Sequence, residues 1–212
     1  MSNFTELRKL ADFLRSVLVV AAALILCSCA APGSKRPKAI ETSDSSGFSI
    51  SEASRVGMWV RSDFTKANQA LESDEIDRGI ALLNEIAVAS PELSAVHINL
   101  GIAYQNSKDF ERAEASLLEA LAINPRHPVA HNELGIVYRR TGRFSEARES
   151  YEAALELQPN FHYARKNLAI LCDLFISDVK CALENYELYQ AAVPDEKMVE
   201  IWIADLINRN GQ

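Results

Sequence analysis

The chain has 212 residues, 48% of them hydrophobic and 24% charged, which is ordinary for a globular protein, and four cysteines are too few for a disulfide framework. The formal net charge is −7. Because the first 28 residues contribute Arg8, Lys9 and Arg15 against Glu6 and Asp12, the 22 basic and 29 acidic residues fall to 19 and 27 without them, a net of −8. Because the residues after position 28 are acidic overall, they do not attract the phosphate groups of nucleic acid, and no nucleic-acid partner is expected.

The N-terminus has the organisation of a secretory signal. Residues 16–32 read SVLVVAAALILCSCAAP, basic residues precede this run, and no charge interrupts it before Lys35. About 16 strongly apolar residues are marginal for crossing the ~30 Å hydrocarbon core of a bilayer. The pattern predicts a signal peptide over residues 1–28. The alternative is an uncleaved inner-membrane signal-anchor, which the positive charges of Lys35, Arg36 and Lys38 favour slightly.

The end of the apolar run resembles the lipobox of bacterial lipoproteins. Leu26 stands at −3 and the small Ser28 at −1 relative to Cys29, whereas Cys27 fits worse because its −1 residue is a leucine. The resemblance implies cleavage after Ser28 and acylation of Cys29, with chains such as palmitate anchoring the protein to the membrane. Several acyl chains give stable attachment, whereas one is marginal. The residue after Cys29 is Ala30 and not an aspartate. In the sorting pattern of such lipoproteins, this implies the periplasmic face of the outer membrane as the destination.

Residues 29–50 are predicted to be the lipidated cysteine and a flexible tether, because Pro, Gly and Ser dominate and few side chains could enter a core. About 20 such residues reach roughly 25 Å as a coil, which would lift a domain off the bilayer. Ser49-x-x-Glu52 has the form of a capping box, so a helix is expected to begin there.

Residues 100–125 and 134–159 carry nearly the same sequence at an interval of 34. The equivalent residues are Leu100 and Leu134, Gly101 and Gly135, Tyr104 and Tyr138, Ala113 and Ala147, Ala120 and Ala154, and Pro125 and Pro159. They recur at helical spacing in two blocks separated by a polar turn, so each copy is predicted to be a helix hairpin. The small residues allow close helix approach, and the proline ends the second helix.

This pattern resembles the tetratricopeptide repeat (TPR). Pro91 lies 34 residues before the first of the two prolines, and a downstream copy fits if one residue is inserted between Cys172 and Ala182. The resemblance implies an all-α fold, a right-handed superhelical solenoid of about four TPR hairpins over residues 51–194. Residues 195–212 are expected to form a capping helix and tail.

In this family the first helix of each hairpin lines a groove that binds partners. The register carries this role to Ala95, Ile98, Ile102, Gln105 and Asn106; to Val129, Asn132, Ile136, Arg139 and Arg140; and to Tyr163, Lys166, Ile170, Asp173 and Leu174. The resulting apolar stripe with cations at one end suits an extended or helical peptide of some acidic character. The alternative is that the isoleucines pack between neighbouring helices and the arginines are simply solvated.

Cys172 and Cys181 flank the turn of the fourth hairpin, where antiparallel helices come close. An exported protein meets an oxidising compartment, which favours a disulfide over two buried thiols. His97 and His131 share one repeat position, but such positions lie on the order of 10 Å apart, against ~2 Å for a Zn–N bond. We therefore expect no metal pair, and no other cofactor.

The sequence shows no grouping of nucleophile, acid and base and no Gly-rich phosphate loop, so neither an enzyme nor a small-molecule substrate is expected. We expect a lipid-anchored envelope scaffold that binds a protein or peptide segment and assembles a larger complex. Such lipoproteins resemble pilotins, which escort secretins in pilus or secretion systems. The alternatives are a non-catalytic regulator of cell-wall or outer-membrane assembly enzymes, and an inner-membrane signal-anchored TPR protein.

Overall fold

The computed structural model describes residues 40–43, 49–52 and 56–211. All of them belong to the unit that begins at Lys38. The predicted signal peptide and the lipidation site at Cys29 lie outside the described residues. Within the described ranges, no helix combines the length and the apolar character needed to cross a bilayer.

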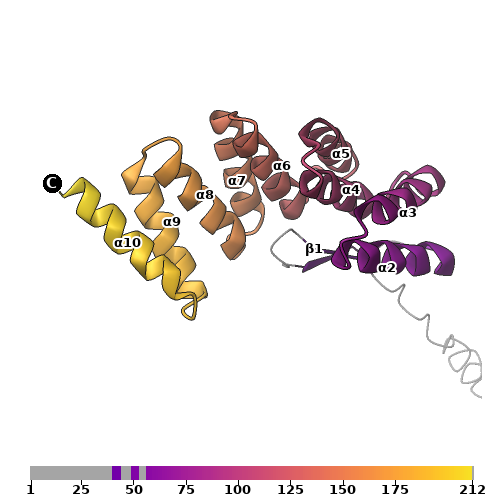
Figure 1. Ribbon diagram of the computed structural model, residues 1–212, viewed down its shortest axis with the longest axis horizontal. Coiled ribbons are helices and arrows are strands. Elements are labelled where there is room, and N and C mark those ends of the chain that lie inside the picture. Colours follow the sequence, from indigo (N-terminus) through magenta and orange to yellow (C-terminus); the bar gives the residue numbers. More distant parts are fainter. Residues whose placement is uncertain (1–39, 44–48, 53–55, 212) are drawn as a thin grey trace, which may run out of the picture. The chain divides into compact units, whose positions relative to one another are not determined.

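Nine α-helices follow one another in the described part of the chain (Figure 1). They are α2 (Met58–Glu72), α3 (Ile76–Ala89), α4 (Ser94–Asn106), α5 (Phe110–Ile123), α6 (Pro128–Arg140), α7 (Phe144–Leu157), α8 (His162–Leu174), α9 (Val179–Ala192) and α10 (Lys197–Asn210). Consecutive helices from α2 to α9 pack as four hairpins, neighbouring hairpins pack on one another, and α10 packs mainly on α9. The predicted helical repeat fold, with four hairpins and a last single helix, is confirmed.

The repeated Leu-Gly pair allows the two helices of a hairpin to touch. A Cβ atom at Gly101 would lie 2.6 Å from Cγ of Leu117, and one at Gly135 would lie 2.6 Å from Cε1 of Tyr151. Leu117 and Tyr151 are fully buried, so neither side chain has room to withdraw. Glycine is therefore required by packing against the facing helix.

The turn inside each hairpin contains one residue with a left-handed backbone. The φ angles are 63° at Asp74, 62° at Lys108, 81° at Gly142 and 54° at Ser177. The intervals are 34, 34 and 35 residues, so the predicted extra residue of the fourth hairpin lies in or just before its turn. Only one of the four copies uses glycine, the residue that adopts this conformation without steric cost.

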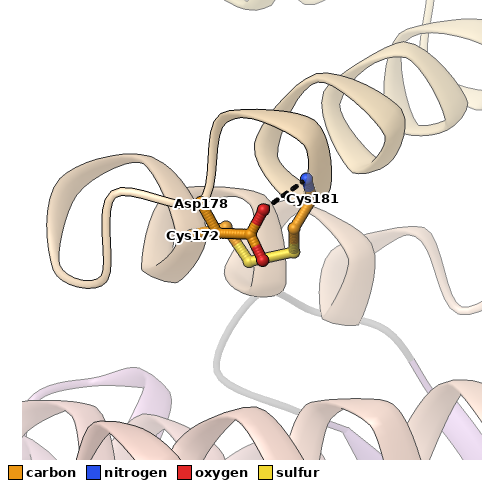
Figure 2. Close-up of side chains that lie close together, drawn as sticks. All are labelled: Cys172, Asp178 and Cys181. Carbon is orange, nitrogen blue, oxygen red and sulfur yellow. Dashed lines mark hydrogen bonds between the residues drawn. A yellow bond between two sulfur atoms is a disulfide. The ribbon is translucent and has the colours of Figure 1, made fainter.

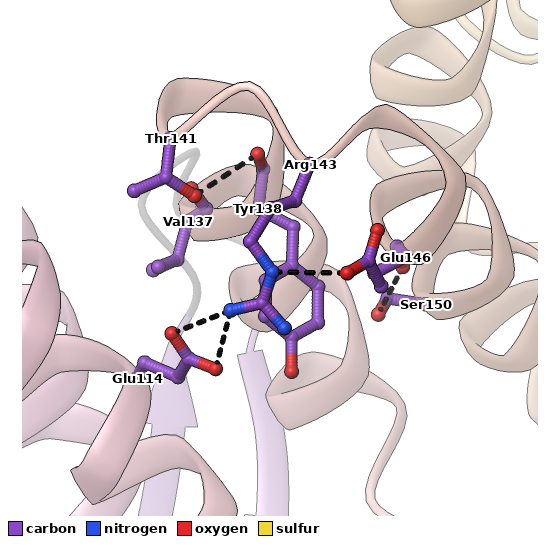
Figure 3. Close-up of polar contacts among 7 residues, drawn as sticks. All are labelled: Glu114, Val137, Tyr138, Thr141, Arg143, Glu146 and Ser150. Carbon is purple, nitrogen blue, oxygen red and sulfur yellow. Dashed lines mark hydrogen bonds and ion pairs between the residues drawn. The ribbon is translucent and has the colours of Figure 1, made fainter.

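Polar contacts join neighbouring hairpins. Nη1 of Arg143 donates to both carboxylate oxygens of Glu114 at 2.7 and 2.9 Å, and Nε donates to Glu146 at 3.0 Å (Figure 3). The guanidinium also lies 4.1 Å from the ring centroid of Tyr138. Because Glu114 is on α5 and Glu146 is on α7, one arginine links the second hairpin to the third.

A β-hairpin precedes the helices and corrects two predictions. Strand β1 (Ile40–Ser43) pairs antiparallel with β2 (Ser49–Glu52), and β1 lies against α4. The helix expected at the capping-box sequence is wrong, because those four residues form β2 and the first described helix begins at Met58. The prediction of a flexible tether also differs from the structure at β1. In both places the backbone groups find partners across the strand pair, which a reading of local sequence does not anticipate.

Candidate functional site

The side chains assigned to the groove become more exposed from α4 to α8. In α4, Ala95 and Ile98 are fully buried, whereas their register equivalents in α8, Tyr163 and Lys166, are half-buried. Leu174, near the end of α8, is 64% exposed. We call this set of register positions the groove face. Its N-terminal part is closed by packing and its C-terminal part is open.

In α4 and α6 the groove face is occupied by contacts within the protein. Ile98 belongs to an apolar cluster that includes Val129, Ala130, Phe161 and Ala164, with Ile102 packed beside it. Gln105 donates to buried Glu133 at 2.9 Å, and Asn132 donates to the same carboxylate at 3.1 Å. Asn167 of α8 donates to Asn132 at 3.0 Å. The structure therefore favours the packing alternative for Ile98, while Ile136 and Ile170 are half-buried and Asn106 is exposed.

The two arginines of the predicted cationic end lie over aromatic rings. Nε of Arg139 donates to the hydroxyl of Tyr151 at 3.3 Å, and its guanidinium is 5.7 Å from the ring centroid of Phe175. Burial raises the pKa of Tyr151 to about 12, so this hydroxyl is neutral. Arg140 lies 5.5 Å from the ring centroid of Phe110. Both cations have partners inside the chain, which reduces their availability to an acidic ligand.

Lys166 is neutralised by the segment that precedes α10. Its Nζ lies 2.6 Å from one carboxylate oxygen of Glu196, and the other oxygen of this carboxylate accepts a hydrogen bond from the hydroxyl of Tyr189. Burial raises the pKa of Glu196, but the hydrogen bonds from Lys166 and Tyr189 outweigh it and hold the pKa below its ordinary value. Glu196 therefore stays ionised, and the predicted attraction of this end for an acidic partner is weakened.

A cleft of about 490 Å³ opens between α8, α9 and α10. It is lined by Ile170, Asp173, Leu174, Tyr186, Trp202, Asp205 and Arg209. Asp173 accepts from Nη2 of Arg209 at 2.7 Å and from the hydroxyl of Tyr186 at 3.4 Å. The rings of Tyr186 and Trp202 are 5.8 Å apart. The cleft is mainly apolar, with its charged groups gathered at Asp173, Asp205 and Arg209.

Three cleft residues, Ile170, Asp173 and Leu174, were predicted from the sequence to lie on the groove face, whereas the contribution of α10 was not. The sequence signal for this contribution was Pro194. It lies three residues before the start of α10, just as Pro125 and Pro159 lie three residues before the starts of α6 and α8. This register places Met198, Ile201, Asp205, Asn208 and Arg209 on the groove face. Met198 and Ile201 are 52% and 58% exposed.

A disulfide joins Cys172 and Cys181 across the turn between α8 and α9 (Figure 2). Asp178 caps α9 by accepting from the backbone N–H of Cys181 at 3.1 Å, and it pairs with Arg148 at 3.0 Å. The backbone hydrogen bond from Cys181 and, to a smaller extent, the contact with Arg148 hold the pKa of Asp178 below its ordinary value. The cysteine and carboxylate ligand atoms lie within 4.8 Å of one another, but the sulfurs are joined and the carboxylate is engaged. The group is therefore a structural link in this state, and not a metal centre.

Neither of the two repeat histidines joins a group of three potential metal ligands in the described residues. Nε2 of His131 donates to the carbonyl of Pro125 at 3.0 Å. This contact gives His131 a structural role at the start of α6.

Comparison with known proteins agrees with the geometry. Residues 92–160 match the family described as tetratricopeptide repeat. No curated protein sequence matches the chain significantly. Together with the hairpins described above, the match supports a helical repeat fold in which residues 92–160 resemble tetratricopeptide repeats.

Solved structures share the fold at low sequence identity. Residues 41 to the end of MamA from Desulfovibrio magneticus RS-1 give a TM-score of 0.65 at 19% identity, over 73% of this chain and 87% of that one. The thermophilic TPR protein TTC0263 of Thermus thermophilus gives 0.61 at 21%, over 70% and 81%. PilF of Pseudomonas aeruginosa gives 0.66 at 19%, over 71% and 68%. These likenesses establish the fold alone.

Proposed function

We propose that this protein is a lipid-anchored scaffold of the bacterial cell envelope, not an enzyme, and that it binds a segment of a partner protein on the open part of its groove face. The observation that carries the proposal is the cleft at α8 and α10, with Leu174, Met198 and Ile201 exposed in the same register. Stacked repeats share one core and present such a surface for extended segments. Large apolar side chains exposed together mark interaction sites.

The lipid anchor of the proposal rests on the sequence around Cys29, with the outer membrane as the destination and the inner membrane as the alternative. Metabolic labelling with palmitate tests it. The wild-type chain should incorporate label and mature to a shorter form, and Cys29→Ala should do neither. A labelled Cys29→Ala chain would place the lipid elsewhere, and an unlabelled, uncleaved wild type would support the inner-membrane signal-anchor.

The complex that we favour is of the pilus or secretin type, because small TPR lipoproteins resemble pilotins. PilF shares the fold at 19% identity, which supports a common architecture and no particular partner. The second candidate, a regulator of cell-wall or outer-membrane assembly enzymes, uses the same groove face. The identity of the captured protein decides between them.

Site-specific photo-crosslinking in the native host tests the binding role. A photoreactive amino acid at position 174 should link the chain to a partner protein, because Leu174 is exposed at the cleft. The matched control is position 88, since Val88 is 85% exposed on α3 and does not line the cleft. Equal crosslinking at both positions, or none at 174, would contradict the proposal.

A further inference from the structure

We propose that the cleft between α8 and α10 receives one bulky apolar side chain of the partner, and that Asp205 selects a basic residue next to it. This inference rests on the proposed function and names the chemistry of the segment that is bound. It also replaces the acidic peptide that the sequence alone suggested.

The apolar part of the cleft fits a large side chain. Ile170 and Leu174 come from α8, Tyr186 from α9 and Trp202 from α10, and the volume of about 490 Å³ lies within the usual range for ligand pockets. Tyr186 is almost fully buried, so it forms a floor that is already packed against Trp202. A leucine or phenylalanine would remove this surface from water, whereas a charged side chain would lose hydration without compensation.

The charged groups of the cleft favour a cation. Asp173 is satisfied, because its side chain is only 5% exposed and accepts from Arg209 and Tyr186. Arg209 donates to two carboxylates at once, through Nη2 to Asp173 and through Nε to Asp205 at 2.8 Å. Asp205 is different, because its side chain is 62% exposed and accepts the arginine through Oδ2. Two carboxylates and one guanidinium leave a net negative charge, and the exposed carboxylate is the group that a lysine or arginine can reach.

The protein provides its own reporter for occupancy of the cleft. The chain has two tryptophans, Trp59 and Trp202, and Trp59 is 51% exposed on α2, outside the cleft. In the full-length Trp59→Phe chain, the tryptophan fluorescence therefore comes from Trp202 alone. The probes are three synthetic peptides that differ only in their central residues, Lys-Phe-Lys, Glu-Phe-Glu and Lys-Ala-Lys, within the same Gly-Ser flanks.

We expect the Lys-Phe-Lys peptide to change the Trp202 emission and to bind roughly tenfold more tightly than either other peptide. Asp205→Lys should reverse the charge preference, and Leu174→Glu should abolish binding of the Lys-Phe-Lys peptide. The matched controls are Glu187→Lys and Leu188→Glu, which change exposed residues of α9 that do not line the cleft and should leave binding unchanged. Circular dichroism confirms that all variants fold.

Equal binding of the three peptides, preference for Glu-Phe-Glu, or no response to any of them would overturn the inference. The proposed function fails separately, through the crosslink at position 174. If that crosslink forms while the glutamate peptide is preferred, the chain binds a partner there and the inferred chemistry of the bound segment is wrong.

Discussion

The groove face of α4 and the groove face of α8 and α10 occupy the same register and have opposite character. In α4, Ile98 is enclosed by side chains of α6 and Gln105 is bonded to a buried carboxylate, and strand β1 lies against the helix. At α8, Leu174 is exposed at the cleft, and at α10, Ile201 is exposed on the groove face. The helix that carries a residue thus decides whether an apolar groove-face position is buried in the core or exposed at the surface.

The difference follows from the neighbours of each helix. Helix α4 packs against α2, α3, α5 and α6, so few of its side chains remain accessible. Helix α10 is the last described element and packs mainly on α9. The same register position therefore has less to cover it at the end of the stack.

The largest expected effect comes from paired truncation of two isoleucines on the groove face. Ile98→Ala should lower the free energy of unfolding by about 2–5 kcal/mol, because it empties space in a closed cluster. Ile201→Ala should change it by no more than about 0.5 kcal/mol, because that side chain is already 58% exposed. Urea unfolding followed by far-UV circular dichroism measures both. Equal losses would remove the distinction between the two parts.

Loss of the disulfide should affect the open part selectively. Replacing Cys172 and Cys181 together by alanine should cost about 2–3 kcal/mol, because the bond closes a short loop in the unfolded chain. Amide hydrogen exchange should accelerate in α8 and α9, whereas exchange in α4 should stay as in the wild type. A reducing agent should reproduce the effect in the wild type and add nothing in the double variant. Acceleration in α4 to the same degree would show that the stack unfolds as one unit.

Substitutions at the left-handed turn positions of the second and third hairpins should have a smaller effect. Lys108→Gly should raise the free energy of unfolding by about 1 kcal/mol, because glycine adopts a φ of 62° without the steric cost of a side chain. Gly142→Ala should lower it by about 1 kcal/mol, since no atom within 4 Å obstructs the new methyl group and only the backbone cost remains. Urea unfolding measures both, and a change of the same sign would show that the backbone angle does not control the turn.

The smallest expected effect is the pH dependence at the cap of α9. Because the folded-state pKa of Asp178 lies below the ordinary 3.8, its ionised form stabilises the fold above that pH, and this contribution is lost as the pH falls through the folded-state pKa. Asp178→Asn should therefore be less stable than the wild type near neutral pH, and the gap should close in strong acid. Thermal unfolding across this range measures it, with exposed Asp195→Asn as the control. A gap that stays constant with pH would show that ionisation of Asp178 is not the source of the difference.

The hairpins could be predicted from the sequence, because the requirement for close helix contact is local and periodic. Gly101 and Gly135 recur at the interval of the family, and the structure shows each against a bulky residue of the facing helix. The insertion near Cys172 was visible as a break in that period. The left-handed residues were missed, since Asp74, Lys108 and Ser177 are not the residue type that normally marks such a turn.

The chemistry of the open groove face could be predicted only in part. Register assigned Lys166 and Asp173 to the groove face, but their ion partners, Glu196 and Arg209, are 30 and 36 residues away and depend on the docking of α10. The β-hairpin was missed for a similar reason. Ser49 and Glu52 fit a helix start locally, whereas pairing with a second segment decides their conformation.

The position of α10 has a consequence for how the protein responds to heat. Trp202, Asp205 and Arg209 provide three of the seven side chains of the cleft, and all three belong to α10, which packs mainly on α9. Local unfolding of α10 would dismantle the cleft while the preceding hairpins stay folded. Binding of the proposed partner segment would in turn stabilise α10, so occupancy of the cleft and the local melting of this helix would be thermodynamically linked.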